Sequence, residues 1–404
     1  MGFEPLFNHN NNNSDAHVPL LLGLQPSALV DHVARVDWSL LDQIPGERGG
    51  SIPVAIEELE YILKEVKTHP LPDDPTPIKT MAGGSVANTI RGLTTGFGIS
   101  SGIIGAYGDD EQGQLFVNNM SSNGVNISRL RKKKGHTAQC VCLVDELGNR
   151  TMRPCLSNAV KVQAEELKRE DFKGSKVDLL NSKDILDMQS THKGLGRLNY
   201  PSCPFYQNTL LNEGWLVMRY AKLNLEVIQA AIDLAKQEGL LVSLDLASFE
   251  MVRNFKLPLL KLLESGNIDL CFANEDEATE LLRGEQNSDP AAAVEFLAKY
   301  CQWAVVTLGA NGCIAKHGKE IVRVPAIGEA KAIDATGAGD LFASGFLYGV
   351  IKGLSLEECC KVGACSGGAV IRSLGGEVTL ENWQWMTKQM QIKGLPTPSP
   401  DVSK

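Results

Sequence analysis

The stretch Asp334-Ala-Thr-Gly-Ala-Gly-Asp340 decides how the rest of this sequence is interpreted. It runs directly into apolar residues at helical spacing, Leu341, Phe342, Phe346 and Leu347. The small-residue turn is therefore expected to end at a helix N-terminus formed by Ala338, Gly339 and Asp340. Glycines let backbone N–H groups approach an anion closely, and the helix dipole favours negative charge there. The pattern predicts an anion site with a carboxylate beside it.

Asp340 has two interpretations. Aspartate commonly caps a helix, and in that case the side chain has only a structural role. Alternatively, Asp340 takes the proton from a hydroxyl that attacks phosphorus, while the Gly337–Asp340 amides stabilise the developing charge. The turn by itself leaves both open.

Outward from this turn, short apolar runs alternate with helical patterns. Alternation of this kind implies right-handed βαβ units and a doubly wound, mostly parallel sheet flanked by helices. Ligands bind such sheets at the carboxyl ends of the strands. The predicted strands are Leu20–Gly23, Ile99–Ala106, Val141–Asp145, Leu240–Leu244, Ile268–Phe272 and Trp303–Leu308, and the predicted helices are Leu225–Gln237, Asp276–Leu282 and Ala291–Tyr300.

Other segments interrupt this alternation. The proline-rich stretch Leu40–Pro77 surrounds one helical segment, Ala55–Lys67, and is predicted to be peripheral. Residues 177–214 carry glycines and prolines among polar residues, and are predicted to be an insertion that either loops out or damages the strand after it. The expected organisation is a disordered tail over 1–18, one domain over 19–390 with lid segments in its N-terminal half, and a flexible tail over 391–404.

Composition limits the classes of partner. The 404 residues carry a net charge of −9, which disfavours nucleic acid or an anionic membrane as the main partner. The basic run Arg131–Lys134 is predicted to be a solvated turn. No secretory segment is visible and the ten cysteines form no C-x-x-C pair, so a cytoplasmic protein with reduced thiols is expected. Several cysteines lie in apolar runs, as small buried hydrophobes do.

A second motif lies in the N-terminal third, Gly83-Gly84-Ser-Val-Ala-Asn88. Paired glycines before a helix let a small molecule lie against the backbone, and Asn88 offers a donor and an acceptor to hydroxyl groups. A tight turn that merely starts a helix would look the same.

The two motifs, in this order, resemble those of the PfkB (ribokinase-like) family of sugar and nucleoside kinases. The resemblance extends from Leu20 to about Trp385, apart from the insertion. It implies a ribokinase-like fold with a small β-rich lid, transfer of a phosphoryl group from ATP to an alcohol, and Mg²⁺ as cofactor. The family usually has Thr where this chain has Ala335.

The resemblance also assigns roles to individual positions. Asp31 corresponds to the aspartate that binds sugar hydroxyls, together with Gly83, Gly84 and Asn88, although Gln25 stands where the family usually has Asn. Glu277 corresponds to the residue that holds Mg²⁺ through water. The nucleotide-side positions are Asn274, Thr307, Gly309 and Gly312, and the positions implied for a monovalent cation such as K⁺ are Asp334 and Ser373.

The sequence says less about which substrate carries the hydroxyl that receives the phosphoryl group. The segment from Val141 to Arg153 resembles adenosine-kinase-like members, and Arg150 or Arg153 could reach a phosphate or remain solvated. The default is a ribonucleoside phosphorylated at its 5′-hydroxyl, with adenosine first. The alternatives are a sugar such as ribose or fructose, and a catalytically silent member that acts as a scaffold. A monomer and a homodimer are both compatible with the sequence.

Overall fold

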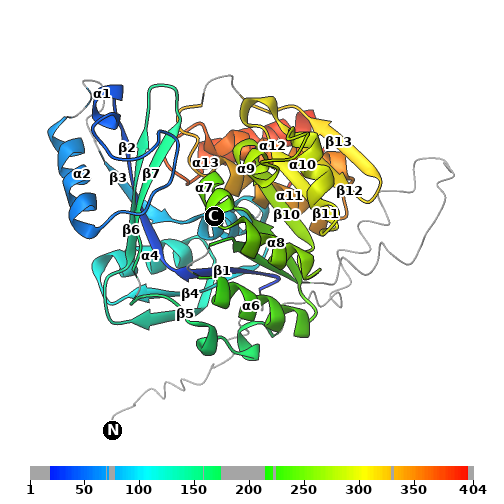
Figure 1. Ribbon diagram of the computed structural model, residues 1–404, viewed down its shortest axis with the longest axis horizontal. Helices are drawn as coiled ribbons and strands as arrows, with labels where there is room; N and C mark the ends of the chain where they lie inside the picture. The colour runs from blue at the N-terminus through cyan, green and yellow to red at the C-terminus, as the bar shows by residue number, and fades with distance from the viewer. Residues whose placement is uncertain are drawn as a thin grey trace, which may run out of the picture.

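The computed structural model describes residues 19–69, 71, 78–157, 159–173, 214–221, 224–328 and 332–398. Within them the chain forms a large and a small β-sheet with helices around both (Figure 1). The predicted tail over 1–18 lies outside the described residues, as do 399–404 and all of the predicted insertion except Gly214.

The large sheet has nine strands in the order β13-β12-β11-β10-β9-β8-β1-β4-β5. The seven strands from β11 to β5 are parallel, whereas β12 and β13 are antiparallel. The predicted doubly wound, mostly parallel sheet is therefore confirmed. Its strands are β1 (Leu21–Ser27), β4 (Ser101–Gly108), β5 (Asn126–Lys133), β8 (Trp215–Arg219), β9 (Leu241–Asp245), β10 (Leu270–Asn274), β11 (Trp303–Thr307), β12 (Cys313–His317) and β13 (Glu320–Val324).

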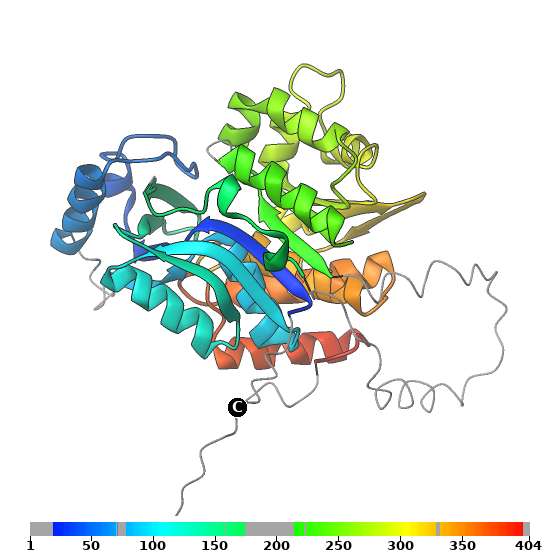
Figure 2. The same cartoon turned by 90° about the horizontal axis from the view of Figure 1, so that it is seen from below.

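Helices cover both faces of this sheet because its buried strands are apolar on both faces. Leu21 packs into one hydrophobic cluster and the next residue, Leu22, into another. Figure 2 shows the two helical layers from below. One side carries α3 (Ser85–Phe97), α4 (Glu111–Ser122), α11 (Ala338–Ile351), α12 (Leu356–Val370) and α13 (Leu380–Ile392); the other carries α6 (Leu225–Gln237), α7 (Phe249–Asn254), α8 (Lys256–Glu264), α9 (Glu275–Leu281) and α10 (Pro290–Leu297). Short 3₁₀ turns are η1 (Ala164–Glu166), η2 (Arg169–Asp171) and η5 (Gly309–Asn311).

The small sheet has the order β3-β2-β6-β7 and is called here the lid sheet, after the lid that the family resemblance implies. Its strands are β2 (Leu29–Arg35), β3 (Lys79–Gly83), β6 (Ala138–Val144) and β7 (Arg150–Cys155), and its helices are α1 (Trp38–Leu41) and α2 (Ile56–Thr68). One face packs on α1 and α2. The opposite face, which carries Val33, Met81 and Met152, is called here the inner lid face. Figure 1 shows the lid sheet at one end of the large sheet.

The basic run was predicted wrongly as a solvated turn. Arg131 and Lys133 lie on β5, an edge strand of the large sheet. Arg131 Nη2 lies 2.6 Å from Asp171 Oδ2, and Lys133 Nζ lies 2.5 Å from Glu166 Oε2. Because η1 and η2 supply these acids, the run fastens the edge strand to the segment that follows the lid sheet.

The strand that follows the predicted insertion is complete. β8 pairs along its length with β9 on one side and with β1 on the other. Trp215, its first residue, is buried. A damaged strand, the second outcome that the sequence left open, is therefore excluded.

Two glycines between β11 and β12 allow a matched test of backbone constraint. Gly312 has φ +90°, and a Cβ there would lie 2.0 Å from the carbonyl oxygen of Val324. Gly309 has φ +54°, and a Cβ there would meet nothing within 4 Å. We expect Gly312→Ala to lower the free energy of unfolding by roughly 3 kcal/mol or more, and Gly309→Ala by about 1 kcal/mol. Urea denaturation measures both, and equal losses would contradict the close packing at Gly312.

Candidate active site

The predicted glycine turn is the start of α11. Gly337 is the N-cap residue, with φ +78° in the left-handed region, and Ala338, Gly339 and Asp340 form the first turn. The first N–H groups of a helix have no partner within it. A Cβ at Gly339 would meet nothing within 4 Å, so the surface in front of this turn is open. The turn has the arrangement required of an anion site.

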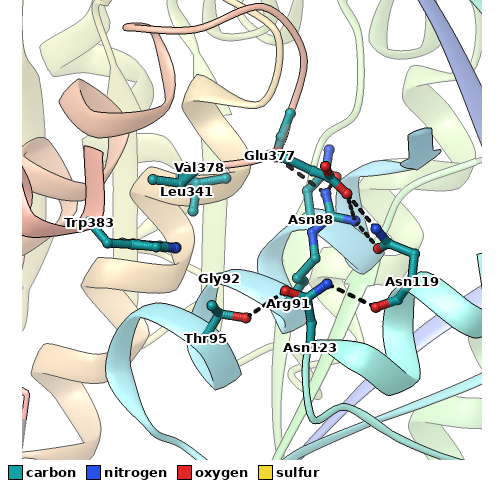
Figure 3. A pocket seen from close by; sticks show the side chains of 11 residues that line it. Asn88, Arg91, Gly92, Thr95, Asn119, Asn123, Leu341, Glu377, Val378 and Trp383 are labelled. Atoms are coloured by element: carbon teal, nitrogen blue, oxygen red, sulfur yellow. Dashed lines mark hydrogen bonds and ion pairs between the residues drawn. The ribbon is translucent and has the colours of Figure 1, made fainter. Parts of the chain in front are cut away.

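Asp340 is held by a chain of polar side chains from α3. Asn88 Nδ2 donates to Asp340 Oδ2 over 2.9 Å, and Arg91 Nη2 donates to Asn88 Oδ1 over 2.8 Å. Arg91 is buried, and its Nη1 lies 3.5 Å from Glu377 Oε1 and 2.8 Å from Asn119 Oδ1. Figure 3 shows the part of this network formed by Asn88, Arg91, Asn119 and Glu377 along one pocket. The amide of Asn88 therefore orients the Asp340 carboxylate.

Two pockets lie on different faces of α3. The one in Figure 3 is lined by Arg91, Asn119 and Trp383 and contains the supporting network. The other is lined by Ser85, Thr89 and Asp340 together with residues at the ends of β8 and β9. The second pocket is the candidate reaction site, because only its lining brings Asp340 to the carboxyl ends of the parallel strands.

Two polar residues at these strand ends, Arg219 and Asp245, were not predicted from the sequence to be site residues. Arg219 ends β8 and Asp245 ends β9, where the two residues are paired in register. Arg219 Nε lies 3.8 Å from Asp245 Oδ1, and its guanidinium also donates to Ser85 Oγ and to the carbonyl of Ala247. Their place directly after apolar strands was the available signal. Arg219 is thus a cation in the wall of the Asp340 pocket.

Two of the residues predicted to lie on the nucleotide side, Asn274 and Thr307, occupy the next strand ends. Asn274 ends β10 and is paired with Thr307, which ends β11. Asn274 also caps α9, because its Oδ1 accepts from the Glu277 amide over 2.9 Å. In return, the Glu277 carboxylate accepts from Asn274 Nδ2 and from its backbone N, each over 2.8 Å. Burial, followed by the charge of Asp245, raises the pKa of Glu277 to about 8. Burial also raises the pKa of Asp245. Glu277 is buried and Asp245 is partly exposed, and their charges repel each other, so an added cation would relieve this repulsion.

The two lid arginines have different positions. Arg150 Nη1 donates to the carbonyl of Ala335 over 3.4 Å, and its charge acts on both Asp245 and Glu277. Arg153 is buried and donates to the carbonyls of Pro45 and Gly50, away from this site. They are three residues apart on β7, and successive side chains of a strand alternate between its faces. Of the two, Arg150 is therefore the one near the reaction site.

Asp31 packs against the paired glycines. A Cβ at Gly83 would lie 2.0 Å from Asp31 Oδ2, so this approach requires glycine. Gln25 supports the same turn, because its Nε2 donates to the Gly83 carbonyl over 3.2 Å and its Oε1 accepts from the Ala87 amide over 2.9 Å. Burial, with the charge of Asp340 as the next cause, raises the pKa of Asp31 to about 7. Gln25, which stands at the family's Asn position, thus holds the Gly83–Gly84 turn beside Asp31.

The raised pKa of Asp31 makes stability depend on pH. An unfolded Asp ionises near its ordinary value, 3.8, whereas the folded carboxyl keeps its proton up to about 7. The free energy of unfolding therefore falls as pH rises across this window, and this loss is complete above pH 7. We expect Asp31→Asn to be more stable than the parent at pH 8, by at most about 4 kcal/mol, and the gap to shrink at pH 5. Urea denaturation of both proteins at the two pH values tests this, and a pH-independent gap would contradict it.

Comparisons with known proteins show the family to which the chain belongs. A match to the description "pfkB family carbohydrate kinase" spans residues 55–383. The chain belongs to the pfkB family of carbohydrate kinases. Family members act as phosphotransferases on nucleosides or sugars, and this chain is accordingly a phosphotransferase with an alcohol group as acceptor.

Similar proteins include both kinds of kinase. The structure of adenosine kinase from Sinorhizobium meliloti matches with a TM-score of 0.71 and 26% identity, covering 90% of this chain and 97% of that one. A probable sugar kinase from Rhizobium etli matches with a TM-score of 0.70 and 25% identity, covering 93% and 98%. Adenosine kinase 2 of Arabidopsis thaliana is 24% identical over 78% of this chain and 86% of its own length. The ribokinase-like fold is thereby confirmed.

Within this pfkB-family chain, Asp334 joins two loops. Its Oδ1 accepts from the Thr336 amide and its Oδ2 from the Gly375 amide, each over 2.7 Å. Ser373 lies in the second loop, where its Oγ donates to the Glu377 carbonyl over 3.4 Å. The buried hydroxyl of Thr336 has no hydrogen-bond partner among the described residues. A cation between these loops stays a prediction, and that hydroxyl is the observation in its favour.

Proposed function

We propose that this pfkB-family protein transfers the γ-phosphoryl group of ATP to the 5′-hydroxyl of an adenosine-like ribonucleoside, with Asp340 as general base. The observation that carries the proposal is the Asp340 carboxylate, placed in the open first turn of α11 and oriented by Asn88 over 2.9 Å. Asp340 would accept the proton of the attacking hydroxyl. The amides of Gly337 to Asp340 would stabilise the charge on the transferred group.

The ATP side would be formed by the ends of β10 and β11. Asn274 and Thr307 lie in register there, and the open surface at Gly309 leaves room for a phosphate chain. Arg219 and Arg150 would add positive charge beside the transferred group. Gly312 would contribute by fixing the turn.

The acids near this position fit Mg²⁺. Magnesium binds oxygen ligands and keeps several of its waters. Glu277 and Asp245 supply carboxylates within mutual electrostatic reach, and either would hold the ion through water. When bound, the metal would neutralise charge on the phosphates.

The acceptor side would be formed by Asp31, Gly83, Gly84 and the inner lid face. An ionised carboxylate can accept hydrogen bonds from two neighbouring hydroxyls, as a ribose offers. Beside Asp31 the inner lid face is apolar, with Leu29, Val33 and Met152 packed in one cluster. An apolar wall suits a nucleobase better than a second polar sugar face, and this supports a nucleoside.

A free sugar is the second candidate, because Asp31 alone fits any vicinal diol. Product formation with ATP and Mg²⁺ distinguishes the candidates when adenosine, inosine, cytidine, uridine, ribose and fructose are compared at equal concentrations. We expect the highest kcat/KM with adenosine. Turnover of the sugars alone would replace the nucleoside assignment, and no turnover of any acceptor by a folded protein would contradict the kinase proposal.

A further inference from the structure

The inner lid face carries two thiols directly beside Asp31. Asp31 on β2 pairs in register with Cys140 on β6, and Cys142 lies two residues further along the same strand. Residues two apart on a strand point to the same face, so both thiols lie on the side of Asp31. All three residues are buried. From the sequence these cysteines are predicted only as small buried hydrophobes, and it is the pairing of β2 with β6 that brings them beside Asp31.

The three side chains have the spacing of a metal site. Each offers one ligand atom, and these atoms all lie within 4.8 Å of one another. Cys142 Sγ lies 3.8 Å from Cys140 Sγ. Two Zn–S bonds of about 2.3 Å at a tetrahedral angle place their sulfurs about 3.8 Å apart. The thiols are therefore already at the separation that a tetrahedral thiophilic ion requires.

Other adjacent thiols lack this arrangement. Cys271 is a close neighbour of Cys301, and Cys360 is a close neighbour of Cys313. Over the described part of the chain, only the group of Asp31, Cys140 and Cys142 brings three such ligands together. Adjacent thiols without a carboxylate thus recur among the described residues. The pair formed by Cys140 and Cys142 differs because the carboxylate of Asp31 lies beside it.

We infer that Asp31, Cys140 and Cys142 form a binding site for a thiophilic divalent cation of the Zn²⁺ class. Two soft thiolates beside one carboxylate suit Zn²⁺-class ions, whereas Mg²⁺ prefers an all-oxygen ligand set. The fourth position would be taken by water. Binding forms two metal–sulfur bonds and releases the two thiol protons to solvent. The negative charges of Asp334 and Asp340 favour a cation here, and the positive charge of Arg91 opposes it.

The functional consequence rests on the proposed kinase activity. A cation on Asp31 occupies the carboxylate that would accept the hydroxyls of the acceptor. The ion would therefore inhibit competitively with the acceptor and not with ATP. The site would make the enzyme sensitive to free Zn²⁺ or Cd²⁺, and a chelator would reverse the effect.

Cadmium binding tests the site independently of activity. The full chain, reduced with a phosphine and freed of metal, is titrated with Cd²⁺ while the ultraviolet cadmium–thiolate charge-transfer band is recorded. We expect saturation at one ion per chain and loss of this band in Cys142→Ala. Cys155→Ala, on the neighbouring strand β7, and the Cys271→Ala/Cys301→Ala pair should keep it. A band that survives in Cys140→Ala/Cys142→Ala, or no band in the parent protein, would overturn the inference.

A measurement on the parent protein covers the case in which the variants fail to fold. X-ray absorption of the one-to-one Cd²⁺ complex should show two sulfur ligands with oxygen in the remaining positions. An all-oxygen or four-sulfur shell would overturn the site. In kinase assays, inhibition reversed by reductant but not by EDTA would indicate thiol oxidation and would equally overturn it. A normal cadmium band in a protein without kinase activity would support the site and refute the proposed function separately.

Discussion

Replacing Asp340 by Asn is expected to lower kcat by about 10²- to 10⁴-fold and to leave ATP binding unchanged. The substitution keeps the size of the side chain and an oxygen that can accept the hydrogen bond from Asn88 Nδ2. It removes the ability to take a proton. Single-turnover kinetics and ATP binding by calorimetry measure the two effects.

The control for Asp340→Asn is an acid in the first turn of another helix. Glu357 lies in the first turn of α12, where its Oε1 is 2.8 Å from Lys361 Nζ. Glu357→Gln removes a charge from a helix start without approaching the reaction site. Its kcat should equal that of the parent. If Asp340→Asn also keeps the parental kcat, Asp340 is only a helix residue.

Asp31→Asn is expected to raise KM for the acceptor by about 10- to 100-fold at pH 8, with KM for ATP unchanged. At that pH the parent carboxylate is ionised, since its pKa is about 7. Hydrogen bonds to a charged acceptor are worth about 1.5–3 kcal/mol, and the amide keeps only neutral ones. Steady-state kinetics with varied acceptor measures the change.

The pH dependence of this KM gives a second readout. Below pH 7 the parent carboxyl becomes protonated and loses its advantage over the amide. The ratio of the two KM values should therefore narrow at pH 6. A ratio that stays constant between pH 6 and 8 would show that the charge of Asp31 does not bind the acceptor.

The long periodic segments could be predicted from sequence. The helix predicted over Leu225–Gln237 has these bounds in the structure, because an amphipathic pattern between two apolar strands leaves few alternatives. The strand that begins at Trp303 and the start of α11 could also be predicted from the local pattern of apolar and small residues. These features depend on neighbours in the sequence.

Features that depend on distant partners were harder to predict. Arg131 and Lys133 looked solvated because Asp171 and Glu166, which pair with them, are more than thirty residues away. The choice between Arg150 and Arg153 depends on which of them lies beside Ala335, a residue far away in the sequence. Arg219 and Asp245 became candidates only when sheet order placed their strand ends beside Asp340. The individual roles of the site residues remain predictions that the substitutions above test.

The hydrogen bond between Asn88 and Asp340 joins residues 252 positions apart. Likewise β1, near the start of the described chain, lies between β4 and β8 in the finished sheet. During synthesis, the candidate reaction site therefore cannot form until most of the polypeptide has been made, because α3 needs α11 and β1 needs β8. Such long-range pairing slows folding and leaves apolar surface exposed in the meantime. A nascent chain released before α11 would contain the lid sheet and Asp31 but would lack Asp340.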